Sequence, residues 1–214
     1  MRRFPRGGLY AINRDQDVGD RLERALEKAI RGGLAVFQYR RKSGPREGRE
    51  HEAARLLQIC RRSGIPLIVN DDVELARRIG ADGVHLGRDD TSLAAARDVL
   101  GRNAIIGVSC YDSVPRAQRV ERAGADYVAF GRFFPSRTKP LATPADAGIL
   151  TEARRLLAIP IVAIGGITPA NGAVLRRAGA DVLAVVDAVF GATDPEAAVR
   201  AFEALFANGG RHDV

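Results

Sequence analysis

The amino-acid sequence predicts an α/β protein with a single (β/α)8 barrel, or TIM barrel, and three features lead to this prediction. The chain has 214 residues, 46% of them hydrophobic, which suits one substantial core of this size. Short β-branched runs alternate with longer amphipathic stretches, as in repeated βα units. A short phrase also recurs where helices meet strands. We expect one domain over residues 1–214, with the barrel over about 9–206 and a disordered tail over 207–214.

Eight strand-like segments follow one another along the chain, each succeeded by a helix-like segment. The clearest helix covers 20–31, where Leu22, Leu26 and Ile30 recur at helical spacing. A doubly wound open sheet is the competing architecture. Eight consecutive units, with no nucleotide-type glycine turn after the first strand, favour the closed barrel. The expected strands are 9–13, 35–39, 66–70, 83–86, 104–108, 127–130, 160–164 and 182–186.

The recurring phrase is Gly-Ala-Asp followed by a β-rich run, and it begins at Gly80, Gly124 and Gly179. Glycine readily takes the left-handed conformation that ends a helix, and each β-rich run starts three residues later. The same joint is therefore expected three times. Thr168-Pro169 and Asp194-Pro195 predict helix starts, each with an N-cap residue before proline at the first helical position.

Composition narrows the classes of function. The formal net charge is +7, but all except three of the 33 basic residues are arginines, scattered over predicted helices without a concentrated basic tract. No aromatic stacking motif of RNA-binding modules is present, so phosphorylated small molecules fit better than nucleic acid. Cys60 and Cys110 have neither disulfide nor zinc-site spacing and are expected to be reduced packing residues.

Location and assembly are less constrained by the sequence. The longest apolar runs fall far short of the roughly 20 residues that cross a bilayer, so we expect no membrane span. The basic N-terminus lacks the apolar run of a secretory signal, which predicts a cytoplasmic protein. A homo-oligomer is compatible with the sequence, which leaves the oligomeric state open.

Polar residues concentrate where the predicted strands end, which is the active-site face of such a barrel. The two-residue period of a strand places Gln38, Arg40 and Lys42 on one face. Asp71 and Asp90 follow adjacent strands, where two carboxylates could share a Mg²⁺ ion that takes its other ligands from water and phosphates. The sequence therefore predicts an anion site beside a metal site.

Each of these residues also has a purely structural interpretation. Asp71, Asp72 or Asp90 could be a helix N-cap, and lysine and arginine side chains are usually solvated. Gly165-Gly166 could form only a tight turn, although it would also let a phosphate approach backbone N–H groups at the start of a helix. His85 is expected to be a packed, hydrogen-bonded side chain. No Ser-His-Asp or Cys-His arrangement is indicated, which argues against nucleophilic hydrolysis.

Six segments of the sequence together form a recognisable pattern. They are Gln-Tyr-Arg-Arg-Lys at 38–42, Val-Asn-Asp-Asp at 69–72, Gly-Val-His-Leu-Gly-Arg-Asp-Asp at 83–90, Ile-Ile-Gly-Val-Ser-Cys at 105–110, Pro-Ser-Arg-Thr-Lys-Pro at 135–140 and Ala-Ile-Gly-Gly-Ile at 163–167. In this order they resemble the thiamine-phosphate synthase family, over about residues 9–206. The family joins 4-amino-5-hydroxymethyl-2-methylpyrimidine diphosphate to 4-methyl-5-(2-hydroxyethyl)thiazole phosphate and releases diphosphate. The resemblance therefore implies a Mg²⁺-dependent transferase with small-molecule substrates.

The resemblance also implies roles for individual residues. It assigns Asp71 and Asp90 to Mg²⁺, and it makes Arg40, Lys42, Ser109 and Lys139 the catalytic residues. The substrate-binding residues that it implies are Gln38, Tyr39, Arg40, Arg41, Lys42, Asn70, Ser109, Ser136, Arg137, Thr138, Lys139, Gly166, Val186 and Asp187.

Departures from the family pattern leave two alternatives open. Asp187 stands where the family usually has serine, and its carboxylate would repel the thiazole phosphate unless it turns away or pairs with an arginine. A non-catalytic barrel that binds phosphate ligands is therefore one alternative. A thiazole tautomerase-like isomerase is the other, although Tyr111 stands where histidine is frequent and the predicted metal pair argues against it.

Overall fold

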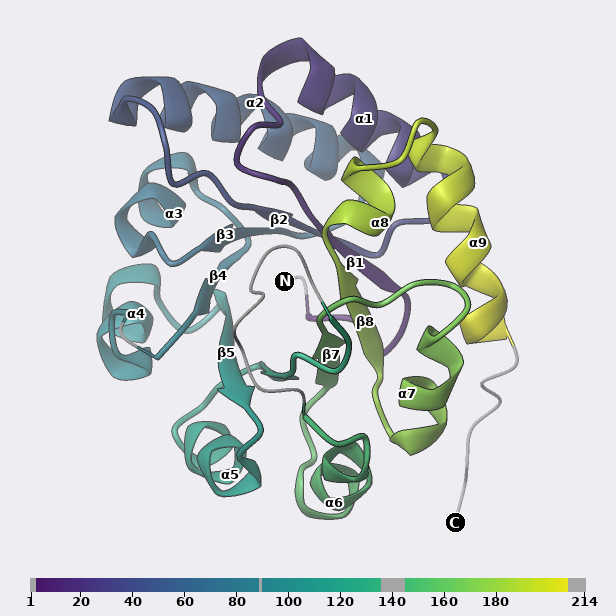
Figure 1. Ribbon diagram of the computed structural model, residues 1–214. Helices are drawn as coiled ribbons and strands as arrows, with labels where there is room; N and C mark the ends of the chain where they lie inside the picture. The colour runs from purple at the N-terminus through teal and green to yellow at the C-terminus, as the bar shows by residue number, and fades with distance from the viewer. Residues whose placement is uncertain (1–2, 89, 136–144, 208–214) are drawn as a thin grey trace.

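The computed structural model describes residues 3–88, 90–135 and 145–207. Within these ranges eight parallel strands pair in chain order, and β8 pairs with β1 to close the barrel. Helices surround the strands (Figure 1). The predicted (β/α)8 barrel is confirmed. The strands are β1 (Leu9–Ile12), β2 (Val36–Tyr39), β3 (Leu67–Asn70), β4 (Gly83–Leu86), β5 (Ile105–Tyr111), β6 (Tyr127–Phe130), β7 (Ile161–Ile164) and β8 (Val182–Val185).

The helices agree with the predicted alternation, and the first begins one residue before the expected 20–31. The described helices are α1 (Gly19–Arg31), α2 (Arg46–Ser63), α3 (Val73–Ile79), α4 (Leu93–Leu100), α5 (Val114–Arg122), α6 (Gly148–Leu156), α7 (Gly172–Ala178), α8 (Asp187–Phe190) and α9 (Pro195–Ala207). Residues 208–214 of the expected tail lie outside the described residues. No helix in the described ranges has the length and apolar character to span a bilayer.

Strand β5 is longer than the expected 104–108. Its pairing with β6 continues past a register irregularity to the pair Tyr111 and Phe130. Ser109 consequently lies inside a strand and not directly after one. The extra length arises because backbone pairing, which periodicity does not report, persists beyond the last β-branched residue.

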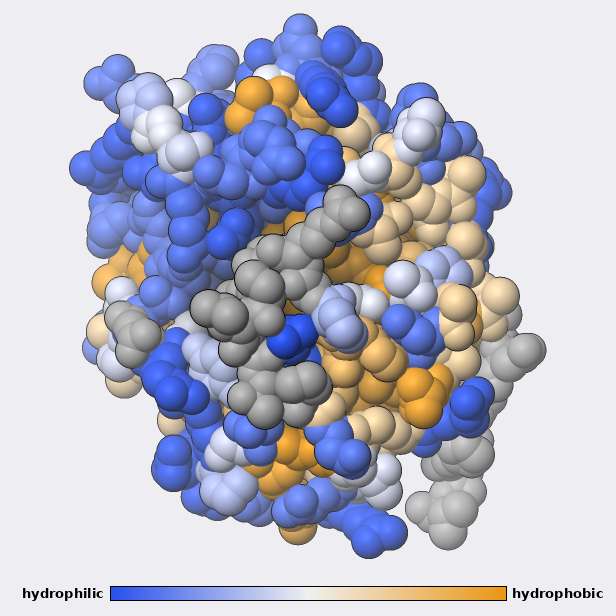
Figure 2. Space-filling model, in the orientation of Figure 1, coloured by the Kyte–Doolittle hydropathy of each residue, from blue (hydrophilic) through white to orange (hydrophobic). Residues whose placement is uncertain are grey.

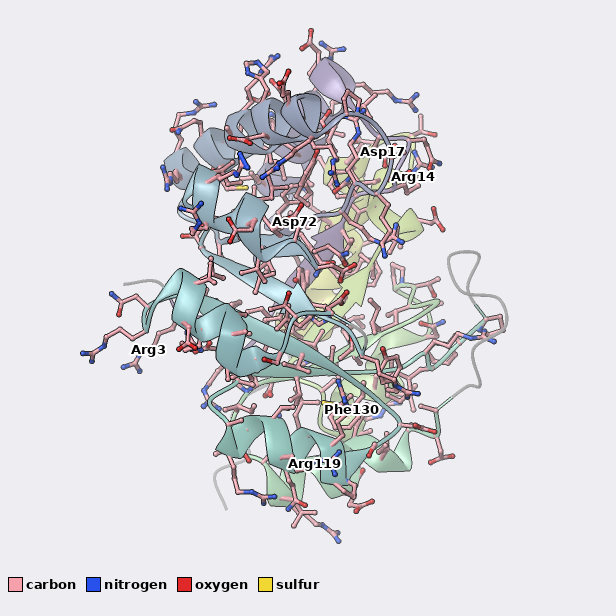
Figure 3. All side chains as sticks on the ribbon, turned by 90° about the vertical axis from the view of Figure 1, so that its left-hand side faces the viewer. Arg3, Arg14, Asp17, Asp72, Arg119 and Phe130 are labelled. Atoms are coloured by element: carbon pink, nitrogen blue, oxygen red, sulfur yellow. The ribbon has the colours of Figure 1, made fainter. Side chains whose placement is uncertain are left out.

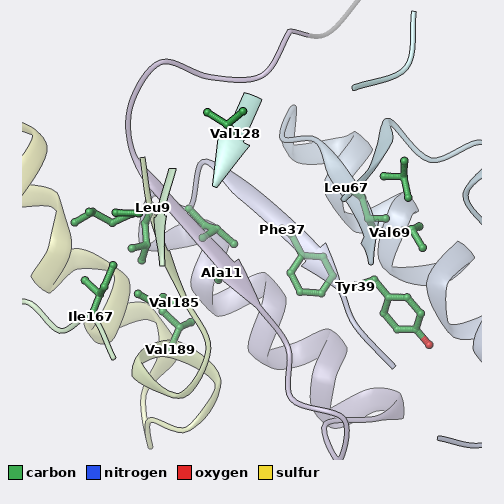
Figure 4. Close-up of a cluster of buried hydrophobic side chains, with 14 of the residues drawn as sticks. Leu9, Ala11, Phe37, Tyr39, Leu67, Val69, Val128, Ile167, Val185 and Val189 are labelled. Atoms are coloured by element: carbon green, nitrogen blue, oxygen red, sulfur yellow. The ribbon is translucent and has the colours of Figure 1, made fainter. Parts of the chain in front are cut away.

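Alternating side chains divide the core into two layers. Phe37 and Tyr39 lie on the same side of β2 and belong to the large cluster between the strands and the helices (Figure 4). Val36 belongs to a smaller cluster in the barrel interior, together with Tyr10 and Tyr127. Cys60 and Cys110 are both buried, as expected of packing residues. Outside the core, hydrophilic residues cover much of the face over α1 to α3 (Figure 2).

The segment before β1 closes one end of the barrel. Phe4 is only 6% exposed, and its ring stacks on that of Tyr127 with centroids 3.8 Å apart and planes 14° from parallel. Tyr127 is the first residue of β6, so Phe4 lies toward the amino-terminal ends of the strands. The carboxyl-terminal ends are the opposite face.

The three expected helix–strand joints are confirmed. Gly80, Gly124 and Gly179 have φ angles of 67°, 91° and 119°, in the region that favours glycine. The aspartate of each phrase has a role that the sequence analysis did not foresee. Asp181, for example, accepts the backbone N–H of Ile161 at 2.8 Å, where β7 begins. Its counterparts Asp82 and Asp126 accept the N–H groups of Leu67 at 2.9 Å and Ile106 at 2.8 Å.

One predicted helix start is confirmed and the other is wrong. Asp194 accepts the N–H of Glu196 at 3.1 Å through its side chain, at the start of α9. Helix α7, however, begins at Gly172 and not at Pro169. Residues 168–171 form a turn, in which the Thr168 carbonyl accepts the N–H of Gly172 at 2.9 Å and the Asn171 side chain accepts the N–H of Thr168 at 2.8 Å. The regular helix begins only after this turn.

Candidate active site

A cavity of about 680 Å³ lies where the strands end. Side chains and backbone that follow β2 to β8 contribute to its wall, as predicted for the functional face of this fold. Its lining includes Gln38, Arg40, Lys42, Asn70, Asp71, His85, Arg88, Asp90, Ser109, Tyr111, Arg132, Gly166, Val186 and Asp187.

Residues 38–42 alternate between the cavity and the helix layer. The cavity is lined by Gln38, Arg40 and Lys42. The other two side chains turn toward α2: the Tyr39 hydroxyl donates to Glu52 at 2.8 Å, and Arg41 pairs with Glu52 at 3.0 Å. The strand period thus extends beyond β2, and Tyr39 and Arg41 instead line a smaller neighbouring cavity of about 210 Å³, which also includes Lys42.

The loop after β1 fixes the backbone that carries the two cations. Asn13 is fully buried; its Oδ1 accepts the N–H of Arg40 at 2.8 Å and its Nδ2 donates to the Arg40 carbonyl at 3.0 Å. Asp15 accepts the N–H of Lys42 at 2.5 Å, and this bond is the main reason that the pKa of Asp15 lies below its usual value. The sequence analysis missed both residues, whose only signal is their place after a strand.

The two predicted metal-binding carboxyls lie next to each other. The pKa of Asp90 is raised, first by burial and then by its hydrogen bond with the Asp71 side chain. Lys42 Nζ lies 3.1 Å from Asp71 Oδ2. Asp71 also has a φ of 63°, which is uncommon for a residue other than glycine and is typical of functional sites.

Neither of these carboxyls is a helix cap. Asp72 caps α3 by accepting the Leu75 N–H at 2.8 Å, and Ser92 caps α4. Asp90 instead accepts the N–H of Gly87 at 2.5 Å. Among the described residues no group of three or more His, Cys, Asp or Glu side chains gathers as a metal site. Two hard oxygen donors suit Mg²⁺, which usually takes its remaining ligands from water and phosphate.

The opposite side of the cavity is built from the ends of β7 and β8. Gly166 has a φ of 63°, and a Cβ atom there would lie 2.3 Å from the Pro135 carbonyl oxygen. Glycine is therefore required by close packing as well as by conformation. Because α7 begins only at Gly172, the expectation of a helix start directly after Gly166 is wrong. Ser136, Arg137, Thr138 and Lys139 lie outside the described residues.

Asp187 is exposed at the cavity wall, at the first position of α8. No described cation lies within ion-pair distance of it. The negative charge of Asp187 affects Arg14. The pKa of Arg14 is raised mainly by its hydrogen bond to Asp17, and Asp187 adds a smaller contribution. Arg14 itself pairs with Asp17 at 2.7 Å (Figure 3). Asp187 therefore remains an acidic group beside the cavity.

Comparison with known proteins identifies the family. The family model for thiamine monophosphate synthase matches residues 9–189. The chain belongs to the thiamine monophosphate synthase family. The match includes all eight strands and the described cavity residues, of which Ala188 is the last in sequence.

Relatives of this thiamine monophosphate synthase family member are similar over nearly their whole length. A thiamine-phosphate synthase of Methylococcus capsulatus is 57% identical over 203 residues, covering 95% of this chain and 91% of the relative. One of Thiobacillus denitrificans is 53% identical, covering 97% and 98%. The solved thiamine phosphate pyrophosphorylase of Pyrococcus furiosus superposes with a TM-score of 0.85 at 31% identity, covering 94% and 96%.

In this thiamine monophosphate synthase family member, two arginines that line the cavity, Arg88 and Arg132, were not among the site residues that the sequence analysis named. Arg88 lies over the Tyr111 ring, 4.6 Å from the centroid, and its N–H donates to the Tyr111 hydroxyl at 3.1 Å. Arg132 lines the cavity after β6. The sequence signal that could have identified Arg88 and Arg132 is their charge together with their places after the ends of strands. The interpretation of His85 as a hydrogen-bonded side chain is confirmed, and it also faces the cavity.

Proposed function

We infer that this protein is a transferase that joins the aminopyrimidine diphosphate to the thiazole phosphate and thereby makes thiamine phosphate. The observation that carries the inference is the contact of Lys42, Asp71 and Asp90 at one edge of the cavity. This arrangement suits a diphosphate leaving group, and it occurs in a chain of the thiamine monophosphate synthase family. Because both substrates are charged metabolites, we also propose a cytoplasmic location.

The diphosphate lies between the two acidic side chains and the cations that face them. Asp71 and Asp90 would hold Mg²⁺, which would supply positive charge to offset part of the negative charge of the diphosphate. Arg40 has no ion-pair partner among the described carboxylates, so its guanidinium is available to phosphate oxygens. Asn13 and Asp15 keep the backbone of Arg40 and Lys42 in place. Lys139 adds a third cation in this proposal.

The bond between the pyrimidine methylene carbon and the diphosphate oxygen breaks first, and both electrons go to the oxygen. The aminopyrimidine ring spreads the positive charge that remains on the carbon. The lone pair of the thiazole nitrogen then forms the new carbon–nitrogen bond. Since no group must remove a proton from the nucleophile, the residues act mainly by electrostatic stabilisation in an enclosed site.

The thiazole phosphate occupies the side of the cavity formed by the β7 and β8 ends. The backbone at Gly166 and Val186 lines this side, and Ser136 and Thr138 contribute hydroxyl groups in this proposal. Gln38, Asn70 and Ser109 line the other side, where the pyrimidine lies. The two substrates therefore meet over the middle of the barrel.

A two-substrate assay with and without EDTA tests the function. We expect thiamine phosphate and diphosphate to appear together in equal amounts, and only when Mg²⁺ is available. Arg40→Ala should severely reduce this turnover. Isomerisation of the thiazole without coupling would instead identify a tautomerase, and binding of phosphate ligands without turnover would identify a non-catalytic barrel. Either result would overturn the proposal.

A further inference from the structure

Five side chains form a continuous hydrogen-bonded chain across the barrel interior, and all of them except Tyr127 line the cavity. Gln38 Nε2 donates to the Tyr10 hydroxyl at 2.5 Å, and the hydroxyls of Tyr10 and Tyr127 are 3.0 Å apart. The Tyr127 hydroxyl lies 2.9 Å from His85 Nδ1, and His85 Nε2 lies 2.9 Å from Ser109 Oγ. Both ends of the chain are proposed pyrimidine-site residues, but its three central members have no role in the reaction as described above.

Two of the three central members are enclosed, and the third, His85, is partly exposed to the cavity. Tyr10 is 1% exposed and Tyr127 is fully buried. Burial raises the pKa of both phenols above the usual value, so each keeps its single proton. A phenol has one proton to donate, and a buried proton needs an acceptor, so a phenol that accepts a hydrogen bond from one neighbour is fully paired only when it donates to the other.

The donor at one end therefore sets the order of protons along the whole chain. Since the Gln38 amide donates to Tyr10, Tyr10 donates to Tyr127, and Tyr127 donates to His85 Nδ1. His85 is then the neutral tautomer with its proton on Nε2, which it donates to Ser109. The Ser109 hydroxyl consequently keeps its own proton for another acceptor. If the Gln38 side-chain amide were flipped, so that its oxygen faced Tyr10, the order would reverse and the Ser109 hydroxyl would donate its proton to His85 Nε2.

We propose that Tyr10, Tyr127 and His85 are positioning residues that hold the Ser109 hydroxyl as a hydrogen-bond donor to an acceptor atom of the pyrimidine diphosphate. The inference rests on the proposed function for the identity of that ligand. His85 acts through Ser109, and the tyrosines act through His85. The same order leaves the Gln38 side-chain oxygen as an acceptor.

Packing keeps the middle of the chain in place. One face of the Tyr127 ring stacks on Phe4. A Cβ atom at Gly107 would lie 1.9 Å from the Tyr127 Cζ atom, so only glycine leaves room for this ring. The hydroxyl of Tyr127 therefore stays between Tyr10 and His85, and the proton order can persist before a substrate arrives.

Nitrogen NMR of the free full-length protein tests the proton order without relying on activity. The protein has three histidines, and the signal that is lost in His85→Gln is that of His85. We expect the neutral tautomer protonated at Nε2, and we expect Tyr127→Phe to shift it toward a mixture because Nδ1 loses its donor. A tautomer protonated at Nδ1, or one that ignores Tyr127→Phe, overturns the proposal.

Kinetics of the same variants test the consequence for the substrate. Tyr127→Phe and Tyr10→Phe should lower kcat/KM for the pyrimidine diphosphate by about 10-fold, roughly one neutral hydrogen bond, and leave KM for the thiazole phosphate unchanged. Phe202→Leu, in the buried face of α9, is the control for lost stability alone. Unchanged kcat/KM in both tyrosine variants rejects the positioning role. Absence of synthase activity in the wild type would reject the proposed function, whereas the NMR result would still decide the proton order.

Discussion

Lys42 Nζ and Asp71 Oδ2 lie 3.1 Å apart, so a cation lies beside the carboxyl pair. The lysine side chain is 60% exposed and that of Asp71 29%, which means that water screens the pair and the ammonium can turn toward another anion. With Asp71 and Asp90 both ionised, these three groups carry one net negative charge. A divalent cation would reverse this sign and make the edge attractive to diphosphate.

Asp71 and Asp72 are adjacent in sequence but should respond in opposite ways to substitution. Asp71→Asn should lower kcat/KM by ~100-fold or more, because a preorganised charge at the leaving group is lost. Asp72→Ala should leave kcat/KM near the wild-type value but cost about 1 kcal/mol in the free energy of unfolding, because it removes the α3 cap. Steady-state kinetics and urea denaturation of both variants distinguish the two roles. A large kinetic defect in Asp72→Ala would contradict this division.

Asp181 should support the barrel without affecting the reaction. It accepts the N–H of Ile161 and pairs with Arg154, so Asp181→Ala leaves a strand N–H without its partner. We expect a loss of about 1–3 kcal/mol in the free energy of unfolding. Asp181→Asn keeps an acceptor oxygen and should lose less. If denaturation curves of the two variants coincide with the wild type, the repeated aspartate has no such role.

Asp187→Ser removes a negative charge from the wall of the cavity near the proposed thiazole-phosphate site. The affinity for that substrate should stay the same or improve, because the carboxylate opposes an anion. Any improvement should shrink as ionic strength rises. KM for the thiazole phosphate at low and high salt measures both effects. A tenfold weakening would mean that Asp187 assists binding.

Both cysteines should be inert in the folded protein. Burial raises the pKa of the Cys110 thiol to about 12, so at pH 8 it remains protonated, and the thiolate is the reactive form. Cys60 is equally inaccessible, with no exposed surface. Mass spectrometry after treatment with iodoacetamide should find no modification under native conditions and two modifications in denaturant. Rapid labelling of native Cys110 would show that the end of β5 opens.

The barrel could be predicted from the sequence because periodicity and turn chemistry agree along the chain. The glycine phrases at Gly80, Gly124 and Gly179 required one backbone conformation, and the structure has it. The helix start expected at Pro169 missed that of α7, because a turn precedes the regular helix, which begins at Gly172. Pattern rules locate the ends of elements less reliably than the elements themselves.

The carboxyl and amide groups that line the cavity were predictable because charged residues gathered after strands. The hydrogen-bonded chain behind them was not, because Tyr10 and Tyr127 look in sequence like ordinary β-strand aromatics. Only the closed barrel brings β1, β4 and β6 close enough for the hydroxyls of Tyr10 and Tyr127 to meet each other and His85. Asn13 and Asp15 escaped notice for the same reason, since their partners are 27 residues away in sequence.

Phe4 links the first few residues of the chain to a reaction at the far end of the molecule. Its ring supports Tyr127, whose hydroxyl lies one step from His85 and two from Ser109. If Tyr127 positions Ser109 as proposed, shortening the protein ahead of β1 would lower the activity from the underside of the barrel, even though every ligand-facing group remained present.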